Sequence, residues 1–432
     1  MPTPGTPLQI GTMEVTGRLY KSATSETRAS DDGYVTNDLL DFYRPMVAAG
    51  TPLIVTGNLF VSRQGKSAGR QAGIDTDDKI DGLAAWARLA HSGGTKLVAQ
   101  LNHGGRQMAK AAPGERIVSA SDVREPMYGC KPSPLRRDEL PGFVDSFVRA
   151  AGRAVAAGMD GLQIHAAHGY LLSQFLTPHT NRRNDDYGGS LENRARLLLD
   201  VMAAVRAEVG DRFPILVKMN GTDDLPYRRA CTTSELIRVA RWLQDLGADA
   251  IEISRGHYES WPGMVQGNYR GFVYNSVTRG PLASSSRVRK AAMLAVGPVV
   301  ERVAGRLRPP TEGFNLDSAA QFTEVLSIPV ICVGGFHTKQ GIEQAIGSGK
   351  VDAVSAARAF IADPHLYRNV VSHPTRNRPV CGYCNICIAS FSTTRIDCGS
   401  EDIRTLRDAN VRRLSADELS IAPAERVPTA PS

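Results

Sequence analysis

The stretch from "GLQIHA" (161–166) to "ILVKMN" (215–220) contains one complete strand–helix–strand unit. The two short runs are apolar, which favours strands. Between them, "SLENRARLLLDVMAAVRAEVG" (190–210) has the apolar spacing of an amphipathic helix, with Ser190 as its cap signal and Gly210 at its end. Strands that are apolar throughout are typical of a parallel sheet, because helices cover such a sheet on its outer face.

The same unit recurs along the chain. Helical patterns such as "TNDLLDFYRPMVAAG" (36–50) lie between short apolar runs that predict strands. The eight predicted strands are 18–24, 52–57, 96–102, 161–166, 215–220, 250–254, 329–335 and 352–358. Eight parallel strands that alternate with helices predict an α/β fold, a closed (β/α)8 barrel formed as a single domain by residues 1–375.

Two connections are longer than ordinary loops and predict lids over the barrel. Residues 104–141 are rich in Pro, Gly and charge, and residues 255–316 include a helical piece at about 291–307. After the barrel come a Cys-rich segment (376–400) and a tail (401–432) whose Ala, Pro, Arg and Ser content predicts mobility.

Composition places the chain among ordinary globular proteins. It has 432 residues, 42% hydrophobic and 22% charged, with a formal net charge of +7 that is not gathered into one basic block. This argues against nucleic acid as a partner. No apolar run approaches the ~20 residues of a membrane helix, and the N-terminus lacks a signal-peptide pattern. We therefore expect a cytoplasmic protein with no membrane segment.

In such a barrel the chemistry lies at the C-terminal ends of the strands. The residues predicted there are Ala23, Thr24, Ser25, Gly57, Gln100, Asn102, His103, His165, His168, Tyr170, Lys218, Asn220, Arg255, His257, Gly334, Gly335, Ala357 and Arg358. The small residues after the seventh and eighth strands, together with Arg358, predict a phosphate site.

The run "HAAHGYLLSQFLTPHTNRRNDDYGGSLENRARL" (165–197) closely resembles the signature of the Old Yellow Enzyme family of FMN-dependent ene-reductases. "GRLYKSATSE", "VAQLNHGGRQ" and "VGGFHTKQGIEQAIGSGKVDAVSAARAFIADP" are similar to the first, third and last blocks of that family. The resemblance covers residues 7–370 and is to the branch near the 2,4-dienoyl-CoA reductase and trimethylamine dehydrogenase barrels.

The resemblance implies FMN at the barrel mouth. Gln100 would bond the pyrimidine edge of the flavin, and Lys218, where many members have Arg, would stabilise negative charge near N1 and the C2 carbonyl. The segment 23–25 would line the ring, although members often carry Pro and Thr or Cys there. The full set of implied cofactor residues is Ala23, Thr24, Ser25, Gly57, Gln100, Lys218, Gly334, Gly335, Ala357 and Arg358.

The same resemblance implies a substrate site. His165 and His168 would donate hydrogen bonds to a substrate carbonyl oxygen, and Tyr170 would deliver a proton. His257 is a candidate for substrate contact or a second proton relay. Each of these side chains could instead be an ordinary residue of the core or of a lid.

Four cysteines form a separate cluster. Cys381, Cys384, Cys387 and Cys398 follow the spacing C-x2-C-x2-C-x10-C, which indicates a metal before disulfides. "CGYCNIC" is similar to the element that holds a [4Fe–4S] cluster after the barrel in trimethylamine dehydrogenase and 2,4-dienoyl-CoA reductase. About thirty residues follow Cys398, without a dinucleotide-binding fingerprint. Iron–sulfur, zinc and free thiols all stay open.

Two functions follow as expectations. The first is an ene-reductase that takes hydride from NAD(P)H through FMN to an α,β-unsaturated carbonyl compound. The second is an FMN/iron–sulfur dehydrogenase or demethylase that passes electrons to a partner protein. A flavin-containing redox sensor or binding protein is a third, non-enzymatic interpretation. A homo-oligomer is open in each case.

Overall fold

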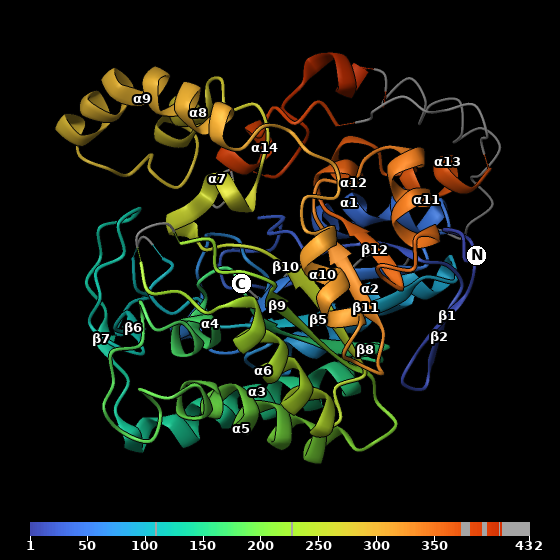
Figure 1. The fold of residues 1–432 in the computed structure, drawn as a ribbon, viewed down its shortest axis with the longest axis horizontal. Coiled ribbons are helices and arrows are strands. Elements are labelled where there is room, and N and C mark those ends of the chain that lie inside the picture. Colours follow the sequence, from blue (N-terminus) through green and yellow to red (C-terminus); the bar gives the residue numbers. More distant parts are fainter. Residues whose placement is uncertain (109, 226–227, 373–380, 391–394, 406, 408–432) are drawn as a thin grey trace.

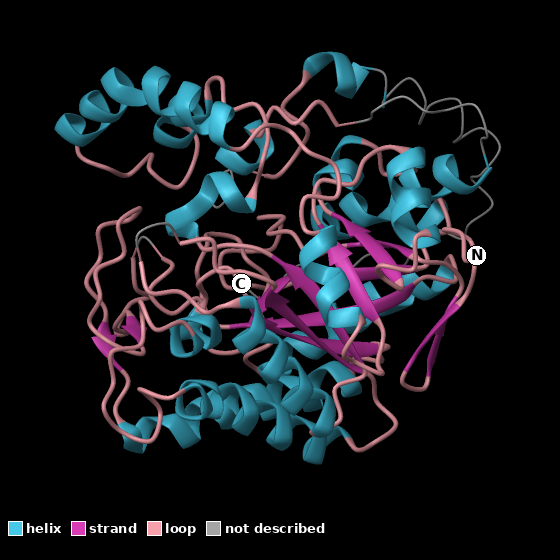
Figure 2. Cartoon of the chain, viewed as in Figure 1, coloured by secondary structure: helices cyan, strands magenta, loops and turns pink. Residues whose placement is uncertain are grey.

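The computed structural model describes residues 1–108, 110–225, 228–372, 381–390, 395–405 and 407. Eight parallel strands close into a barrel, in the order β10-β11-β12-β3-β4-β5-β8-β9 (Figures 1 and 2). These strands are β3 (Leu19–Lys21), β4 (Leu53–Phe60), β5 (Lys96–Asn102), β8 (Gly161–Ala166), β9 (Ile215–Asn220), β10 (Ala250–Ser254), β11 (Val330–Val333) and β12 (Ala353–Ala356). Each corresponds to one predicted strand, so the (β/α)8 prediction is confirmed.

Helices surround the strands on the outside of the barrel (Figure 2). They are α1 (Asn37–Ala48), α2 (Ile80–Ser92), α3 (Leu140–Ala156), α4 (Leu171–Leu176), α5 (Leu191–Val209), α6 (Thr233–Asp245), α10 (Leu316–Thr323), α11 (Lys339–Gly347), α12 (Arg358–Ala362) and α13 (Leu366–Ser372). Thr36 and Ser190 cap α1 and α5 as predicted, because each hydroxyl accepts from the backbone N–H three residues on.

Two apolar cores hold the barrel. The larger lies between strands and helices, and the smaller fills the barrel interior. An N-terminal hairpin of β1 (Leu8–Ile10) and β2 (Met13–Val15) supplies Ile10, Met13 and Val15 to the smaller core. Its strands are only three residues long, too short to show a period, so the sequence did not predict this hairpin.

Strand β4 is longer than its prediction, which ended at Gly57. Its register against β5 shifts between Val55 and Asn58, and pairing then continues to Phe60. Such a bulge re-aims the side chains beyond it. It matters here because Asn58 lines the cavity described below.

The two predicted lids form irregular layers. Residues 104–141 contain β6 (Val118–Ser119) and β7 (Ser133–Pro134), and 255–316 contain α7 (Trp261–Met264), α8 (Phe272–Thr278) and α9 (Arg287–Leu307). The predicted helical piece is thus part of α9, which stands with α8 away from the barrel (Figure 1). Short 3₁₀ turns lie at Arg63–Gly65, Asp77–Lys79, Arg137–Glu139 and Tyr258–Ser260, and a final helix is α14 (Ile386–Ala389).

Within the described ranges, no helix combines the length and apolarity needed to cross a membrane. Most of the predicted tail, residues 406 and 408–432, lies outside the described residues.

Candidate active site

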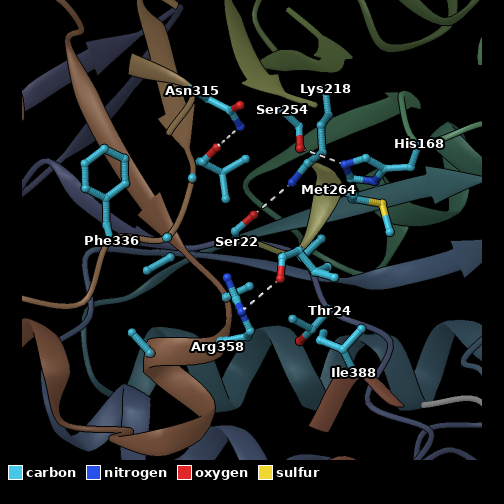
Figure 3. Close-up of a pocket in the computed structure, with 18 of the residues that line it drawn as sticks. Ser22, Thr24, His168, Lys218, Ser254, Met264, Asn315, Phe336, Arg358 and Ile388 are labelled. Atoms are coloured by element: carbon cyan, nitrogen blue, oxygen red, sulfur yellow. Dashed lines mark hydrogen bonds between the residues drawn. The ribbon is translucent and has the colours of Figure 1, made fainter. Parts of the chain in front are cut away.

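A cavity opens at the C-terminal ends of the barrel strands. The empty space inside it is about 1180 Å³, counting open solvent at its mouth. The predicted residues that line it are Ala23, Thr24, Ser25, Gln100, His165, His168, Tyr170, Lys218, Gly334, Gly335, Ala357, Arg358 and Cys381. They come from six of the eight strand ends and from the segment after the barrel, and some appear in Figure 3.

His165 and His168 lie together at the end of β8, with ring centroids 5.1 Å apart and planes nearly perpendicular. The backbone N–H of Ala167 donates to Nδ1 of His165 at 3.3 Å, so the neutral ring carries its proton on Nε2. Nε2 of His168 lies 2.7 Å from the Ser254 hydroxyl (Figure 3). When Ser254 donates to it, Nδ1 of His168 carries the proton. Both rings then offer one N–H donor.

Both imidazoles are neutral in this environment. Burial lowers the pKa of His165 well below its ordinary value, and His168 and Lys218 lower it further. Burial likewise lowers the pKa of His168, and the charges of Lys218 and His257 add to this effect. A pair of neutral donors can polarise a carbonyl oxygen without itself exchanging the proton.

The Tyr170 hydroxyl lies next to this pair, its ring 4.9 Å from that of His165. It is 2.7 Å from the hydroxyl of Tyr258 and accepts from the Asn58 amide at 3.4 Å. Burial raises the pKa of Tyr170, whereas hydrogen bonds from Tyr258, Ser67 and Asn58 oppose the rise. These partners would stabilise the Tyr170 phenolate that remains if Tyr170 gives up its proton.

A buried ion-pair group fixes the loop that carries Tyr258. The neighbouring Glu259 accepts from the Arg106 guanidinium and lies 3.0 Å from Nε2 of His179. Arg106 also donates to the carbonyls of Val123 and Arg124, at 3.0 and 3.1 Å. Burial alone would raise the pKa of Glu259, but His179 and Arg106 hold it down to about 2. The two lids are therefore joined beside the cavity.

Glu252 of β10 organises the floor of the cavity. Its carboxylate accepts from the side chains of Ser22, Gln163, Lys218 and Ser355 at 2.8, 2.6, 3.1 and 2.6 Å. Burial opposes the charged form, yet Lys218 and these hydrogen bonds keep the pKa of Glu252 below its ordinary value. The floor is a satisfied ionic network, which holds Lys218 in one place.

The residues at the floor fit the flavin that the resemblance implies. Lys218 donates to Ser22 at 2.8 Å and to Glu252, which leaves one of its three N–H donors for a flavin oxygen (Figure 3). The Gln100 amide donates to Gln163 at 2.7 Å, so its own oxygen stays available as an acceptor. Oδ1 of Asn58 is buried and has no hydrogen-bond partner within the described ranges, as expected where a bound group completes the site.

The predicted phosphate end lies across the cavity. Gly335 has a φ of +74°, a conformation that favours glycine, and Gly334 lies beside it in the lining. One terminal nitrogen of Arg358 donates to the Gln266 carbonyl at 3.0 Å and to Asn385. A guanidinium has five N–H donors, so its remaining donors suit an anion.

Lys218→Ala is expected to slow flavin reduction by about ten- to a hundredfold, the effect of losing one charged hydrogen bond to a developing anion. The change also leaves Glu252 as an unpaired buried charge, which costs about 3–5 kcal/mol of stability. Lys218→Met with Glu252→Gln removes both charges. Stopped-flow reduction should stay slow in this variant while the thermal midpoint recovers. Flavin reduction at the wild-type rate in both variants would show that Lys218 does not stabilise the negative charge of the reduced flavin.

Six of the residues predicted at the strand ends do not line the cavity: Gly57, Asn102, His103, Asn220, Arg255 and His257. His257 is fully buried, with Nε2 3.2 Å from Asp223 and 3.1 Å from Thr177. It braces the loop behind His168, to which its backbone is bridged. Gly57 packs behind the wall, where a Cβ atom would overlap the carboxylate of Glu26. Neither Gly57 nor the His257 imidazole is part of the cavity lining.

Other lining residues were missed by the sequence reasoning. Asn58 lay beyond the predicted end of its strand, and Tyr258 lies in a lid with no periodic pattern. Ser254 ends a predicted strand, so its position was a usable signal. Glu252 does not itself line the cavity, but it bonds the lining residues Ser22 and Lys218. It was treated as part of an apolar strand, although a lone carboxylate among apolar residues indicates a buried network.

The four predicted metal cysteines lie near one another, since Cys381 and Cys384 both contribute to the raised pKa of Cys387 and of Cys398. Cys387 and Cys398 belong to one apolar cluster, against which Cys381 packs. Burial raises the pKa of Cys387, of Cys398 and of Cys381. In the part of the chain that the structure describes, no three His, Cys, Asp or Glu side chains are placed to hold a metal ion. The arrangement therefore gives the iron–sulfur and zinc hypotheses no support.

Comparison with known families gives one match. Residues 6–300 match the NADH:flavin oxidoreductase / NADH oxidase family.

Two characterised relatives illustrate the range of similar chains. A metal reductase of Desulforamulus reducens is 32% identical over 380 residues, which cover 88% of this chain and 50% of that one. A 4,4'-dithiodibutanoate disulfide reductase of Rhodococcus erythropolis is 29% identical over 413 residues, 94% of this chain and 98% of that one. The chain spans about half the length of several curated relatives it matches.

Solved structures share the fold. The old yellow enzyme homologue of Zymomonas mobilis superposes with a TM-score of 0.68 at 24% identity, covering 92% of this chain and 100% of that one. At this identity the likeness concerns the fold alone.

Proposed function

The chain belongs to the NADH:flavin oxidoreductase / NADH oxidase family, and on that premise we propose that it is an FMN-dependent ene-reductase. In this proposal NAD(P)H reduces the flavin, and the enzyme then reduces the C=C bond of an α,β-unsaturated carbonyl compound. The observation that carries the proposal is the pair of neutral donors, His165 and His168, beside the phenol of Tyr170 in one cavity.

Each side chain has a defined task in this reaction. Bound FMN would supply the hydride to the carbon β to the carbonyl. The two imidazole N–H groups hold the carbonyl oxygen and stabilise the enolate charge that develops on it. Tyr170 donates a proton to the α carbon, and the hydrogen bond from Tyr258 stabilises the phenolate that remains. Gln100 and Lys218 would hold the flavin.

The test is anaerobic turnover with NADH or NADPH and a panel of cyclic enones, with products identified by mass spectrometry. The proposal expects the saturated ketone to form with matching consumption of the nicotinamide. Amines are the comparison set: reduction of the flavin by an amine, with no turnover of any enone, would contradict it.

A dehydrogenase that passes electrons to a partner protein is the second candidate. The sequence spacing of Cys381, Cys384, Cys387 and Cys398 favours it, and Cys381 also lies in the cavity wall. One relative at 29% identity is named N,N-dimethylglycine/sarcosine dehydrogenase. Iron and acid-labile sulfide analysis separates the candidates. About four of each per chain would support the second, and free thiols titrating in the native protein would oppose it.

A further inference from the structure

The apolar side chains that the fold exposes are concentrated on one helical hairpin. Eleven large apolar residues are exposed in the described ranges, and eight of them lie on α8 and α9. Those eight are Tyr274, Val288, Leu294, Val296, Val299, Val300, Val303 and Leu307. Isolated exposed apolar residues are ordinary, but a contiguous group indicates a binding surface. We call this group the α9 stripe.

Polar contacts attach α9 to the protein, in addition to the packing of Ala304. On the inner side, Arg289 donates to the carbonyls of Met127 and Tyr128 at 2.6 and 3.3 Å. Glu301 accepts from the backbone N–H groups of Gly271 and Val273 at 2.9 and 2.8 Å. A surface helix normally buries its large apolar residues. In α9 the large valines are exposed instead, and only Gly297 and Ala304 are buried.

Five members of the α9 stripe share one side of the helix. Val288, Val296, Val299, Val303 and Leu307 recur at intervals of eight, three, four and four residues, close to whole helical turns. Val288 is 81% and Leu307 71% exposed. The apolar face thus extends along the whole helix.

The surroundings of the α9 stripe are cationic. Residues 270–308 contain eight Arg and Lys residues and one acidic residue, Glu301. Glu301 is used inside the hairpin, and Arg308 pairs with Asp224. Arg289 donates to backbone carbonyls, so the other cations supply the positive charge of this surface. Arg302 and Arg306 are exposed beside the valines.

We propose that α9 docks on an anionic lipid bilayer, lying in the interface with its valines inserted and its arginines on lipid headgroups. A helix that combines one apolar face with cationic flanks has this preference. A second copy of the chain would bring two cationic surfaces together, which opposes association. An acidic protein would match the charge, but Val and Leu rarely dominate binding between proteins, where Trp, Tyr and Arg do.

The hairpin also adjoins the cavity. Ala304 of α9 packs with Val265, Tyr269 and Phe272, and Met264 packs against the same cluster. Met264 and Val265 line the cavity. Docking through α9 would therefore place the active site close to the membrane surface.

The test is flotation of the full-length protein with vesicles of phosphatidylcholine alone and with added phosphatidylglycerol. The wild type should bind the anionic vesicles at least about tenfold more tightly, and high salt should weaken binding. Val299→Glu with Val303→Glu should abolish it. The matched control, Val155→Glu with Val371→Glu, alters two similarly exposed valines, 44% and 42% exposed, on α3 and α13 and should bind as the wild type does.

Circular dichroism and flavin content confirm folding of each variant. If the valine variant fails to fold, Arg302→Glu with Arg306→Glu tests the same surface and should lose binding too. Failure of the wild type to float with anionic vesicles overturns the proposal, as does full binding by either α9 variant. A dimer that forms without lipid and is broken by the valine variant would instead identify a second copy as the occupant, and would also overturn it.

Discussion

The double change of His165 and His168 to alanine is expected to leave FMN bound and to abolish tight binding of phenols and enones. Each histidine offers one N–H donor to the same oxygen, and a hydrogen bond to a charged or developing anionic group contributes about 1.5–3 kcal/mol. Loss of both therefore predicts a drop in affinity of roughly a hundred- to ten-thousandfold. Titration of the flavin spectrum with a phenol measures it.

His168→Asn is the matched control, because an amide also offers an N–H donor. It should bind the phenol within about tenfold of the wild type, the equivalent of about 1.4 kcal/mol. Tight binding by the double alanine variant would remove the donor role from both histidines. Loss of FMN by the double variant would indicate that the two histidines serve to bind the cofactor and not the substrate.

Tyr170→Phe is expected to slow reoxidation of the reduced enzyme by an enone by about a hundred- to ten-thousandfold, the usual contribution of a positioned general acid. Reduction of the flavin by NAD(P)H should not change, because that step needs no proton from Tyr170. Stopped-flow measurement of the two half-reactions separates these effects. Equal rates of reoxidation in variant and wild type would show that another group supplies the proton.

Tyr258→Phe gives a graded comparison. It removes one neutral hydrogen bond to Tyr170, worth about 0.5–1.5 kcal/mol, so reoxidation should slow by only about two- to tenfold. Tyr269→Phe is the control, because its hydroxyl donates to the Pro262 carbonyl and does not line the cavity. A larger loss of reoxidation rate in Tyr258→Phe than in Tyr170→Phe would identify Tyr258 as the proton donor and Tyr170 as its hydrogen-bond partner.

The barrel could be predicted because its strands are short, continuous and apolar. β8, β9 and β10 begin and end at the predicted residues. Since all parallel strands end at one rim, residues distant in the sequence, such as Gln100, His165 and Lys218, could be placed in one cavity.

Features that depend on irregular backbone could not be predicted in the same way. The bulge in β4 turns Asn58 into the cavity, and the paired lids place Tyr258 against Tyr170. The cysteine spacing gives their separation along the sequence. Whether the thiols converge on one metal ion depends on the conformation of an irregular loop, which has no periodic pattern from which it could be predicted. The same limit applies to His257, whose partners come from distant segments.

The central claim is tested most directly by following the visible spectrum of the purified protein under anaerobic conditions. NADPH or NADH should bleach the flavin bands, and a cyclic enone added afterwards should restore them with one equivalent of enone per flavin. A flavin that is bleached by the nicotinamide, stays bleached with every enone and recovers only on admission of oxygen would contradict the assignment of this cavity as an ene-reductase site.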